Sequence, residues 1–486
     1  MSGIGSSAVK KEFESKWMIL FAVMLGNFMA PLDASIVNTI LPSLTRFFRT
    51  EISIIQWVPT VYLLTISCLI LMYGRLGDMF GHKRIFLTGI GAFTVTSILC
   101  GLSQNIWMLI TFRALQGLSG GMVMSVGAAI VTAAFPPTER GKALGTFAIC
   151  IAIGLAIGPT LGGIITEYLN WRWVFFVNVP IGILALFWGL RTIPLGNLKK
   201  GQRLDWPGSL VAFIFLFSIL LYANRGKEWG WFSPLPLALV AAAVISIFLF
   251  IWIERKTAEP MLNLALFNNR IFSFSNLSAL LSFMTAYTVV FLTPFYMTFV
   301  LHYNILKVGM VMAASPVVTL FVAPLSGAAS DRIGSRWPAC CGMIICSLAL
   351  ILFSSLKTDS STLDVVWRLA LFGLGMGIFQ SPNNSAVMGS VPKMHLGIAS
   401  GILAAVRNVG MVFGIAVAGA ILYNAAPIAI SRHPGSFSRS ELLEFVSGFH
   451  WSYLSGTLWA GIAVLTSFAA KSTKETLDPA ADRIIP

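Results

Sequence analysis

The sequence has few charged residues. Only 11% of its 486 residues are Asp, Glu, Lys or Arg, against about a quarter in an ordinary soluble protein. A chain of this length would need far more charge to cover the surfaces of water-soluble domains. Hydrophobic residues make up 56% of the chain and the mean hydropathy is +0.81, which also excludes intrinsic disorder. The composition therefore predicts an all-α protein that crosses a membrane many times.

Several functional classes lack the residues they need. The five histidines are scattered, and no spacing of His, Cys, Asp or Glu suits a metal ion, so we expect no metal site. No glycine-rich phosphate-binding loop is present, which argues against energy from ATP bound to this chain, and we expect no cofactor. The net charge of +14 comes from basic residues in short loops between apolar runs, which disfavours nucleic acid as a partner.

Apolar runs long enough to cross a bilayer recur along the chain. A spanning helix needs about 20 apolar residues. With the N-terminus in the cytoplasm, 21 of the 33 Lys and Arg residues fall on the cytoplasmic side and nine on the outer side, which predicts that both termini are cytoplasmic. We count fourteen such runs, which start near Trp17, Ile54, Ile85, Ile106, Lys142, Trp173, Trp206, Leu237, Phe272, Val308, Trp337, Val365, Gly397 and Trp451.

The two ends of the chain contain related motifs. Offsets of 253 to 256 residues relate Asp78 to Asp331, Arg113 to Arg368, and three glycines of the fifth run to three near residue 414. Transporters are often built from such repeats. We therefore expect a cytoplasmic N-terminus (1–16), a six-helix bundle (17–192), a linker with two inserted helices (193–256), a second six-helix bundle (257–471) and a cytoplasmic tail (472–486). We expect the protein to be a monomer.

Asp33 is the one acidic residue well inside an apolar run. A charge at that depth costs about 2.5–3.5 kcal/mol even on lenient scales. Such a group must face a cavity, pair with a base or carry a proton. We interpret Asp33 as a proton-coupling residue with Arg113 as its partner, because arginine stays charged in any environment and can hold a carboxylate without titrating. The alternatives are a structural ion pair that never titrates, and an Arg113 that reaches toward the outer surface.

The fifth run has a stripe of small residues. Glycines at four-residue intervals let another helix approach closely, and a proline there removes a backbone donor and favours a bend. This pattern suits a seam between two halves that must seal against leakage, although a glycine stripe alone also occurs in ordinary membrane helices. The residues are Gly145, Gly154, Gly158, Pro159, Gly162 and Gly163.

A loop after the second run combines glycines with charges of both signs, and it recurs weakly in the second half. Glycines permit a tight turn, and an Asp among basic residues can form ion pairs that hold a gate closed. The alternative is a solvated loop that only sets topology. The candidate gating residues are Gly74, Asp78, Gly81, Arg84, Asp331 and Arg332.

Polar and aromatic residues within the apolar runs are candidates for a substrate cavity. An amide that faces lipid is costly, whereas an aromatic residue there can equally belong to the core or to an interfacial belt. The candidates are Asn38, Trp57, Tyr62, Gln116, Tyr287, Phe291, Tyr296, Gln380, Asn383, Asn384 and Asn408.

These motifs together resemble the major facilitator superfamily, and specifically its fourteen-span drug:proton antiporter branch. The resemblance rests on residues 32–42, 74–84, 113–121, 145–163 and 171–180. It implies alternating access and proton-driven export of small amphipathic or hydrophobic compounds across the cell membrane of a prokaryote. It implies that Asp33 and Arg113 serve in proton coupling, and that small molecules, protons and the lipid bilayer are the partners. The chain would not be an enzyme.

Other functions remain open at this point. Within transport, the substrate could be a specific lipid, siderophore or metabolite, or the proton could travel with it as symport. A sensor or a membrane-embedded transferase is a different class, and neither an Asp-rich metal site nor a large soluble domain supports it. Residues 272–329 contain no acid, which favours neutral, monocationic or amphiphilic substrates over divalent cations.

Overall fold

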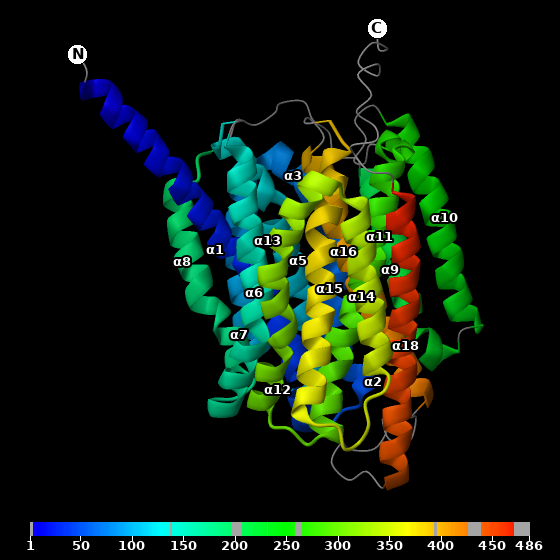
Figure 1. Cartoon of the computed structure of the whole chain (residues 1–486). Coiled ribbons are helices and arrows are strands. Elements are labelled where there is room, and N and C mark those ends of the chain that lie inside the picture. Colours follow the sequence, from blue (N-terminus) through cyan, green and yellow to red (C-terminus); the bar gives the residue numbers. More distant parts are fainter. Residues whose placement is uncertain are drawn as a thin grey trace.

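The structure is a computed structural model that describes residues 3–136, 139–195, 206–230, 232–257, 264–392, 396–425 and 439–470. Within these ranges the chain forms helices and no strands, which confirms the predicted all-α class. The long helices run roughly parallel to one another as one bundle (Figure 1). This arrangement follows from the composition, because only structures that satisfy their own backbone hydrogen bonds can span a bilayer.

The first half of the chain contains one unusually long helix. This helix, α1, covers 46 residues and includes Pro31 and Pro42. The bounds of the elements in this half are α1 Gly3–Phe48, α2 Ile52–Ile55, α3 Trp57–Phe80, α4 His82–Gly101, α5 Ile106–Ala134, α6 Arg140–Tyr168, α7 Trp173–Phe176 and α8 Asn178–Thr192.

Two helices then precede the second half. They are α9 (Trp206–Trp229) and α10 (Pro234–Lys256). The second half consists of η1 Leu264–Asn268, α11 Arg270–Phe295, the π-helical turn η2 Tyr296–Val300, α12 Ile305–Met312, α13 Ala314–Ile333, α14 Arg336–Phe353, α15 Thr362–Gly389, α16 Leu396–Ala425 and α18 Arg439–Ala469.

Eleven helical segments among the described residues are long and apolar enough to cross a membrane. Helices α6, α9 and α18 occupy three more of the predicted runs but are not among the eleven, and the described apolar stretch of α9 covers only Pro207–Ile219. The helical membrane fold is therefore established, whereas the count of fourteen spans stays a prediction.

The two halves share local geometry at corresponding positions. The junction between α3 and α4 turns at Gly81, whose φ is +95°, and the junction between α13 and α14 turns at Gly334, whose φ is +85°. Glycine adopts this left-handed backbone without strain, which explains its presence at both turns. The paired helices α1 and α6 in the first half correspond to α11 and α16 in the second, and both pairs pack closely.

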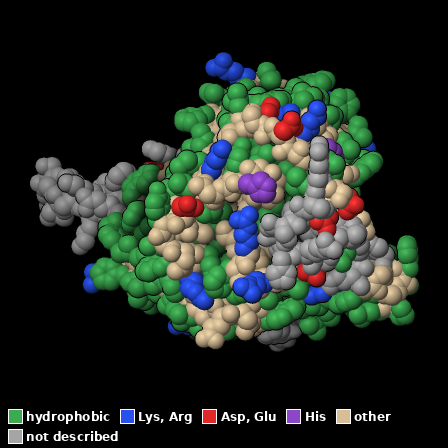
Figure 2. Space-filling model, turned by 90° about the horizontal axis from the view of Figure 1, so that it is seen from below, with side chains coloured by type: hydrophobic (Ala, Val, Ile, Leu, Met, Phe, Trp, Pro, Cys, Tyr) green, Lys and Arg blue, Asp and Glu red, His purple; other side chains and the backbone are tan. Residues whose placement is uncertain are grey.

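The two ends of the bundle differ. Helix α1 begins and α18 ends at the upper end in Figure 1, whereas α2 and the start of α12 lie at the lower end. We call this lower end the α2 face. Figure 2 views the molecule from that side, where charged and polar side chains gather over the middle and hydrophobic side chains surround them.

The inserted helix α9 lies against both halves. It packs on α3 of the first half and on α16 of the second. The Arg225 guanidinium of α9 lies 5.1 Å from the centre of the Trp57 ring at the start of α3. The inserted pair therefore covers one side of the line along which the halves meet.

Candidate functional site

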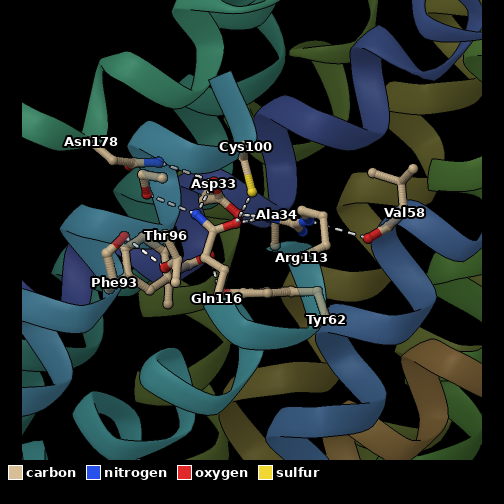
Figure 3. Close-up of polar contacts among 12 residues, drawn as sticks. Asp33, Ala34, Val58, Tyr62, Phe93, Thr96, Cys100, Arg113, Gln116 and Asn178 are labelled. Atoms are coloured by element: carbon tan, nitrogen blue, oxygen red, sulfur yellow. Dashed lines mark hydrogen bonds and ion pairs between the residues drawn. The ribbon is translucent and has the colours of Figure 1, made fainter. Parts of the chain in front are cut away.

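The carboxylate of Asp33 lies at the centre of a buried polar network (Figure 3). Asp33 is fully buried in α1, two residues after Pro31. One carboxylate oxygen accepts hydrogen bonds from Gln116 at 3.1 Å and from Asn178 at 3.0 Å, and the other forms an ion pair with Arg113. Three side-chain donors therefore satisfy the two oxygens of one buried carboxylate.

Arg113 is held from three directions. Its Nε donates to the Val58 carbonyl at 3.1 Å, and its Nη1 donates to both Asp33 and the side-chain oxygen of Gln116, the latter at 2.7 Å. The guanidinium lies 4.0 Å from the centre of the Tyr62 ring, within the range of a cation–π interaction. Its buried Nη2 has no hydrogen-bond partner in the described chain. The cation is thus fixed in position with one donor left unused.

Gln116 connects the ion pair to α4. Its amide nitrogen also donates to the Ser97 hydroxyl at 2.8 Å, and its oxygen accepts from the Cys100 thiol at 3.6 Å. Positions 113 and 116 are one turn apart on α5, so both side chains reach the same carboxylate. The network therefore joins helices α1, α3, α4, α5 and α8 within the first half.

The pair is electrically balanced only while Asp33 is ionised. A proton on Asp33 would neutralise the carboxylate and leave Arg113 as an uncompensated buried cation. Breaking a buried pair in this way typically costs about 3–5 kcal/mol. One proton at this site can therefore change which arrangement of the surrounding helices is stable.

The same segment of α1 packs on the glycine stripe of α6. A Cβ at Gly154 would lie 3.3 Å from the backbone nitrogen of Leu32, and a Cβ at Gly158 would lie 2.5 Å from the Cβ of Ser35. The Ser35 hydroxyl also donates to the Leu155 carbonyl at 2.8 Å. The residues on either side of Asp33 are therefore in close contact with α6.

Helix α6 in turn meets the second half near the α2 face. A Cβ at Gly163 would lie 2.8 Å from the Ile305 carbonyl oxygen, and a Cβ at Gly309 would overlap the carbonyl oxygen of Pro159. Two further contacts join the halves at this end. Arg46 donates to the Thr298 carbonyl at 3.3 Å, and Gly419 of α16 accommodates the side chain of Gln56. These contacts close the bundle at the α2 face.

The predicted cavity residues fall into three groups. Tyr62 and Gln116 belong to the Asp33 network, and Tyr62 and Tyr287 are close enough to interact electrostatically across the two halves. Four other candidates each have a buried polar atom without a hydrogen-bond partner in the described chain. They are Asn38, Trp57, Asn383 and Asn408.

The remaining candidates lie elsewhere. The Tyr296 hydroxyl donates to the Lys357 carbonyl at the α2 face, and Phe291 packs edge-on against Phe295. Gln380 is half-buried and Asn384 is exposed on α15.

The predicted gating loops form the two glycine turns described above. Gly74 has no atom within 4 Å of where its Cβ would lie, and Arg84 and Arg332 are exposed. The side chains of Asp78 and Asp331 lie outside what the structure describes. The latch role of these loops therefore stays a prediction. In the glycine stripe, Gly145 lies near the start of α6 and Gly162 packs on Ile36 of α1.

The two arginines related by the repeat occupy different environments. Arg368 lies near the α2 face, where its Nε donates to the Leu352 carbonyl at 2.8 Å and its Nη1 to the Asp364 carbonyl at 2.7 Å. It joins α15 to the end of α14, and the carboxylate 3.4 Å from its Nη1 is that of the partly exposed Asp364. Arg113 is instead paired with the fully buried Asp33.

Sequence reasoning did not identify Asn178 as a site residue, nor Ser97, Cys100 or Arg407. Asn178 is the polar residue at the start of the apolar helix α8, and a search for amides beside buried acids would have found it. Arg407 is an arginine inside a predicted span, and the cost of a charge at that depth is the signal that would have found it.

Comparisons with known proteins extend these observations. The model of the Major Facilitator Superfamily matches residues 23–415 and 275–473. The fold is similar to that of a bacterial homologue of the human lysosomal transporter Spinster in an inward-facing, unoccupied conformation. The TM-score is 0.66 at 15% identity, and the similarity covers 97% of this chain and 99% of that one.

Named relatives are transporters and resistance proteins. The riboflavin transporter RibZ of Clostridioides difficile is 34% identical over 83% of this chain and 87% of its own length. The multidrug resistance protein Stp of Mycobacterium tuberculosis is 34% identical over 88% of this chain and 81% of its own. The tetracenomycin C resistance and export protein of Streptomyces glaucescens is 28% identical over 84% of this chain and 76% of its own.

Proposed function

The chain belongs to the major facilitator superfamily, and on that premise we propose that it is a fourteen-span antiporter that exports small amphipathic compounds in exchange for protons. The family and fold are those of a transporter and not of an enzyme. The observation that carries the proposal is the fully buried Asp33 carboxylate, paired with Arg113 and bound by Gln116 and Asn178. Relatives named as multidrug resistance proteins support the substrate class.

The coupling follows from the contacts around Asp33. In its ionised form the carboxylate holds α1 against α5 and α8, and α1 holds the glycine stripe of α6, which closes the α2 face against α12. Protonation removes the charge-assisted hydrogen bonds and leaves Arg113 uncompensated. This change releases α1 and favours the arrangement that is open at the α2 face. We place the α2 face outside the cell, and both termini in the cytoplasm.

The energy of one proton is sufficient for useful export. A unit charge that crosses about 100 mV releases roughly 2.3 kcal/mol. At about 1.4 kcal/mol per tenfold change in concentration, this sustains a gradient of roughly 50-fold for a neutral substrate. The reaction needs no bound cofactor, because the driving force comes from the proton gradient.

A second candidate is transport of one specific metabolite. The relative named as a riboflavin transporter, at 34% identity, favours this reading. Symport of proton and substrate is the corresponding alternative for coupling. The two modes predict opposite directions of accumulation in the same vesicles.

Uptake into proteoliposomes tests the proposal. With sulforhodamine B, whose sulfonate oxygens stay ionised at both pH values so that protonation cannot trap the dye, we expect accumulation inside vesicles whose lumen is acidic, and its loss when an ionophore collapses the gradient. Protein-free vesicles give the background. Accumulation only in vesicles with an alkaline lumen would show symport and would contradict the proposal.

A further inference from the structure

Arg407 is a cation inside the bundle that the coupling mechanism does not use. It lies on α16 and is half-buried. Its Nε is buried without a hydrogen-bond partner, and no side chain or carbonyl in the described part of the chain forms an ion pair or hydrogen bond with it. An unpaired charge at this depth is costly, so such residues usually serve function.

Helix α11, on which α16 packs, offers no counter-charge to Arg407, because neither residues 271–329 nor residues 365–425 contain an Asp or Glu. The electrostatic neighbour of Arg407 is Tyr287 of α11. With Asp33 ionised, Arg113 is balanced, whereas no ion pair within the described residues balances Arg407.

Packing does not explain the arginine. Gly410 and Gly414 on α16 meet the backbone of α11 as Gly154 and Gly158 on α6 meet α1. At the same 256-residue offset, Arg407 corresponds to Ile151. The first half achieves the same helix contact with an aliphatic side chain, so the shared architecture does not require a cation here.

Two buried amides on α15 and α16 have unused donors. Asn383 and Asn408 are 3% and 2% exposed, and the Nδ2 of each has no partner in the described chain. A packed cluster that contains Phe272 of α11, Val387 of α15 and Ile402 of α16 shows which levels of the three helices lie side by side.

Each helix has a residue one turn from its cluster residue, toward the middle of the helix. These residues are Asn276 on α11, Asn383 on α15 and Val406, the neighbour of Arg407, on α16. The Asn276 amide nitrogen donates to the Phe272 carbonyl, and its oxygen is unpaired. The unpaired amide groups of Asn276 and Asn383 and the turn of α16 that carries Arg407 and Asn408 therefore lie at one level of the bundle.

We propose that Arg407, with Asn383 and Asn408, binds the oxygen-bearing edge of the transported molecule, which is a carboxylate or a set of conjugated carbonyls. Unsatisfied N–H groups and an uncompensated cation are complementary to such acceptors. Tyr287 is an electrostatic neighbour of both Arg407 and Tyr62, and its ring can contact an apolar body beside the arginine. This inference rests on the proposed transport function and names its substrate class.

Two matched dyes test this class of substrate. Rhodamine 110 carries a free carboxylate, and rhodamine 123 is its methyl ester. Binding to the purified full-length protein in detergent is measured by fluorescence anisotropy without any gradient. We expect the acid to bind at least tenfold more tightly than the ester. Arg407→Gln should weaken acid binding by about 10- to 100-fold, the range expected for a charge-assisted hydrogen bond, and ester binding less than twofold.

Two further variants and one control complete the test. Arg407→Lys keeps the charge and should retain part of the preference, and Asn383→Ala should weaken acid binding severalfold. Arg368→Gln removes an arginine that the structure places at the α2 face and should leave both affinities unchanged. Equal affinity for the two dyes, including no binding of either, or an equal loss of both in Arg407→Gln, overturns the proposal. Because no gradient is present, failure here is distinct from failure of proton-driven uptake.

Discussion

Asp33→Asn is expected to abolish accumulation of substrate against its gradient. The roughly 50-fold gradient that a proton sustains at about 100 mV should fall to unity in vesicles that contain this variant. The amide keeps the shape of the side chain and can still accept from Arg113, but it cannot bind and release a proton. We therefore expect the variant to insert, to fold and to bind substrate within a few-fold of the wild type.

The matched control for this experiment is Asp364→Asn. It makes the same chemical change at an acid of the capping box that begins α15, where Ser361 and Asp364 satisfy each other's backbone donors. The Asn oxygen can still accept from the Ser361 backbone nitrogen, so the change should cost at most about 1 kcal/mol of stability and leave coupling intact. Uphill uptake by Asp33→Asn equal to that of the wild type would refute the coupling role.

Gly309→Ala is expected to prevent closure at the α2 face. A Cβ at this position would overlap the Pro159 carbonyl oxygen and lie 3.1 Å from the Cα of Gly163. Both obstacles are backbone, so neither can rotate away. Overpacking of this kind costs about 1–3 kcal/mol. Because only the closed state bears this cost, the equilibrium between the closed and open states shifts about 5- to 150-fold toward the open state. Transport should fall by a comparable factor.

The distance between two spin labels, measured by electron paramagnetic resonance, reports this shift directly. Spin labels at Phe47 and Lys307, both exposed at the α2 face, should show a longer distance in Gly309→Ala than in the wild type. Gly461→Ala is the matched control, because no atom lies within 4 Å of where its Cβ would lie. Wild-type distances together with wild-type transport in Gly309→Ala would show that this seam does not open during the cycle.

The sequence identifies the main elements of the site because they are chemically rare. An acid inside an apolar run is costly enough that Asp33 stands out, and Arg113 is one of few bases at similar depth. The structure brings these two side chains together, although their roles stay predictions. The glycines of α6 were also recognisable, since regular spacing along one helix defines a face before any partner is known.

Other features depend on how distant helices meet. Asn178 belongs to the site only because α8 packs beside α1, and no periodicity in the sequence encodes that contact. That no described residue pairs with Arg407 is likewise a property of the folded chain. The number of spans also depends on more than helix formation, because α6, α9 and α18 are helical but are not among the eleven apolar segments that the described residues support.

Proton release on substrate binding tests the central claim most directly. Purified protein in weakly buffered detergent solution, near the pH at which half of the molecules carry the coupling proton, is mixed with substrate while a pH indicator records the change. We predict release of protons from the wild type and from Arg368→Gln, and none from Asp33→Asn at saturating substrate. Binding by the wild type without proton release, or equal release from Asp33→Asn, would contradict the assignment of Asp33 as the group that exchanges protons.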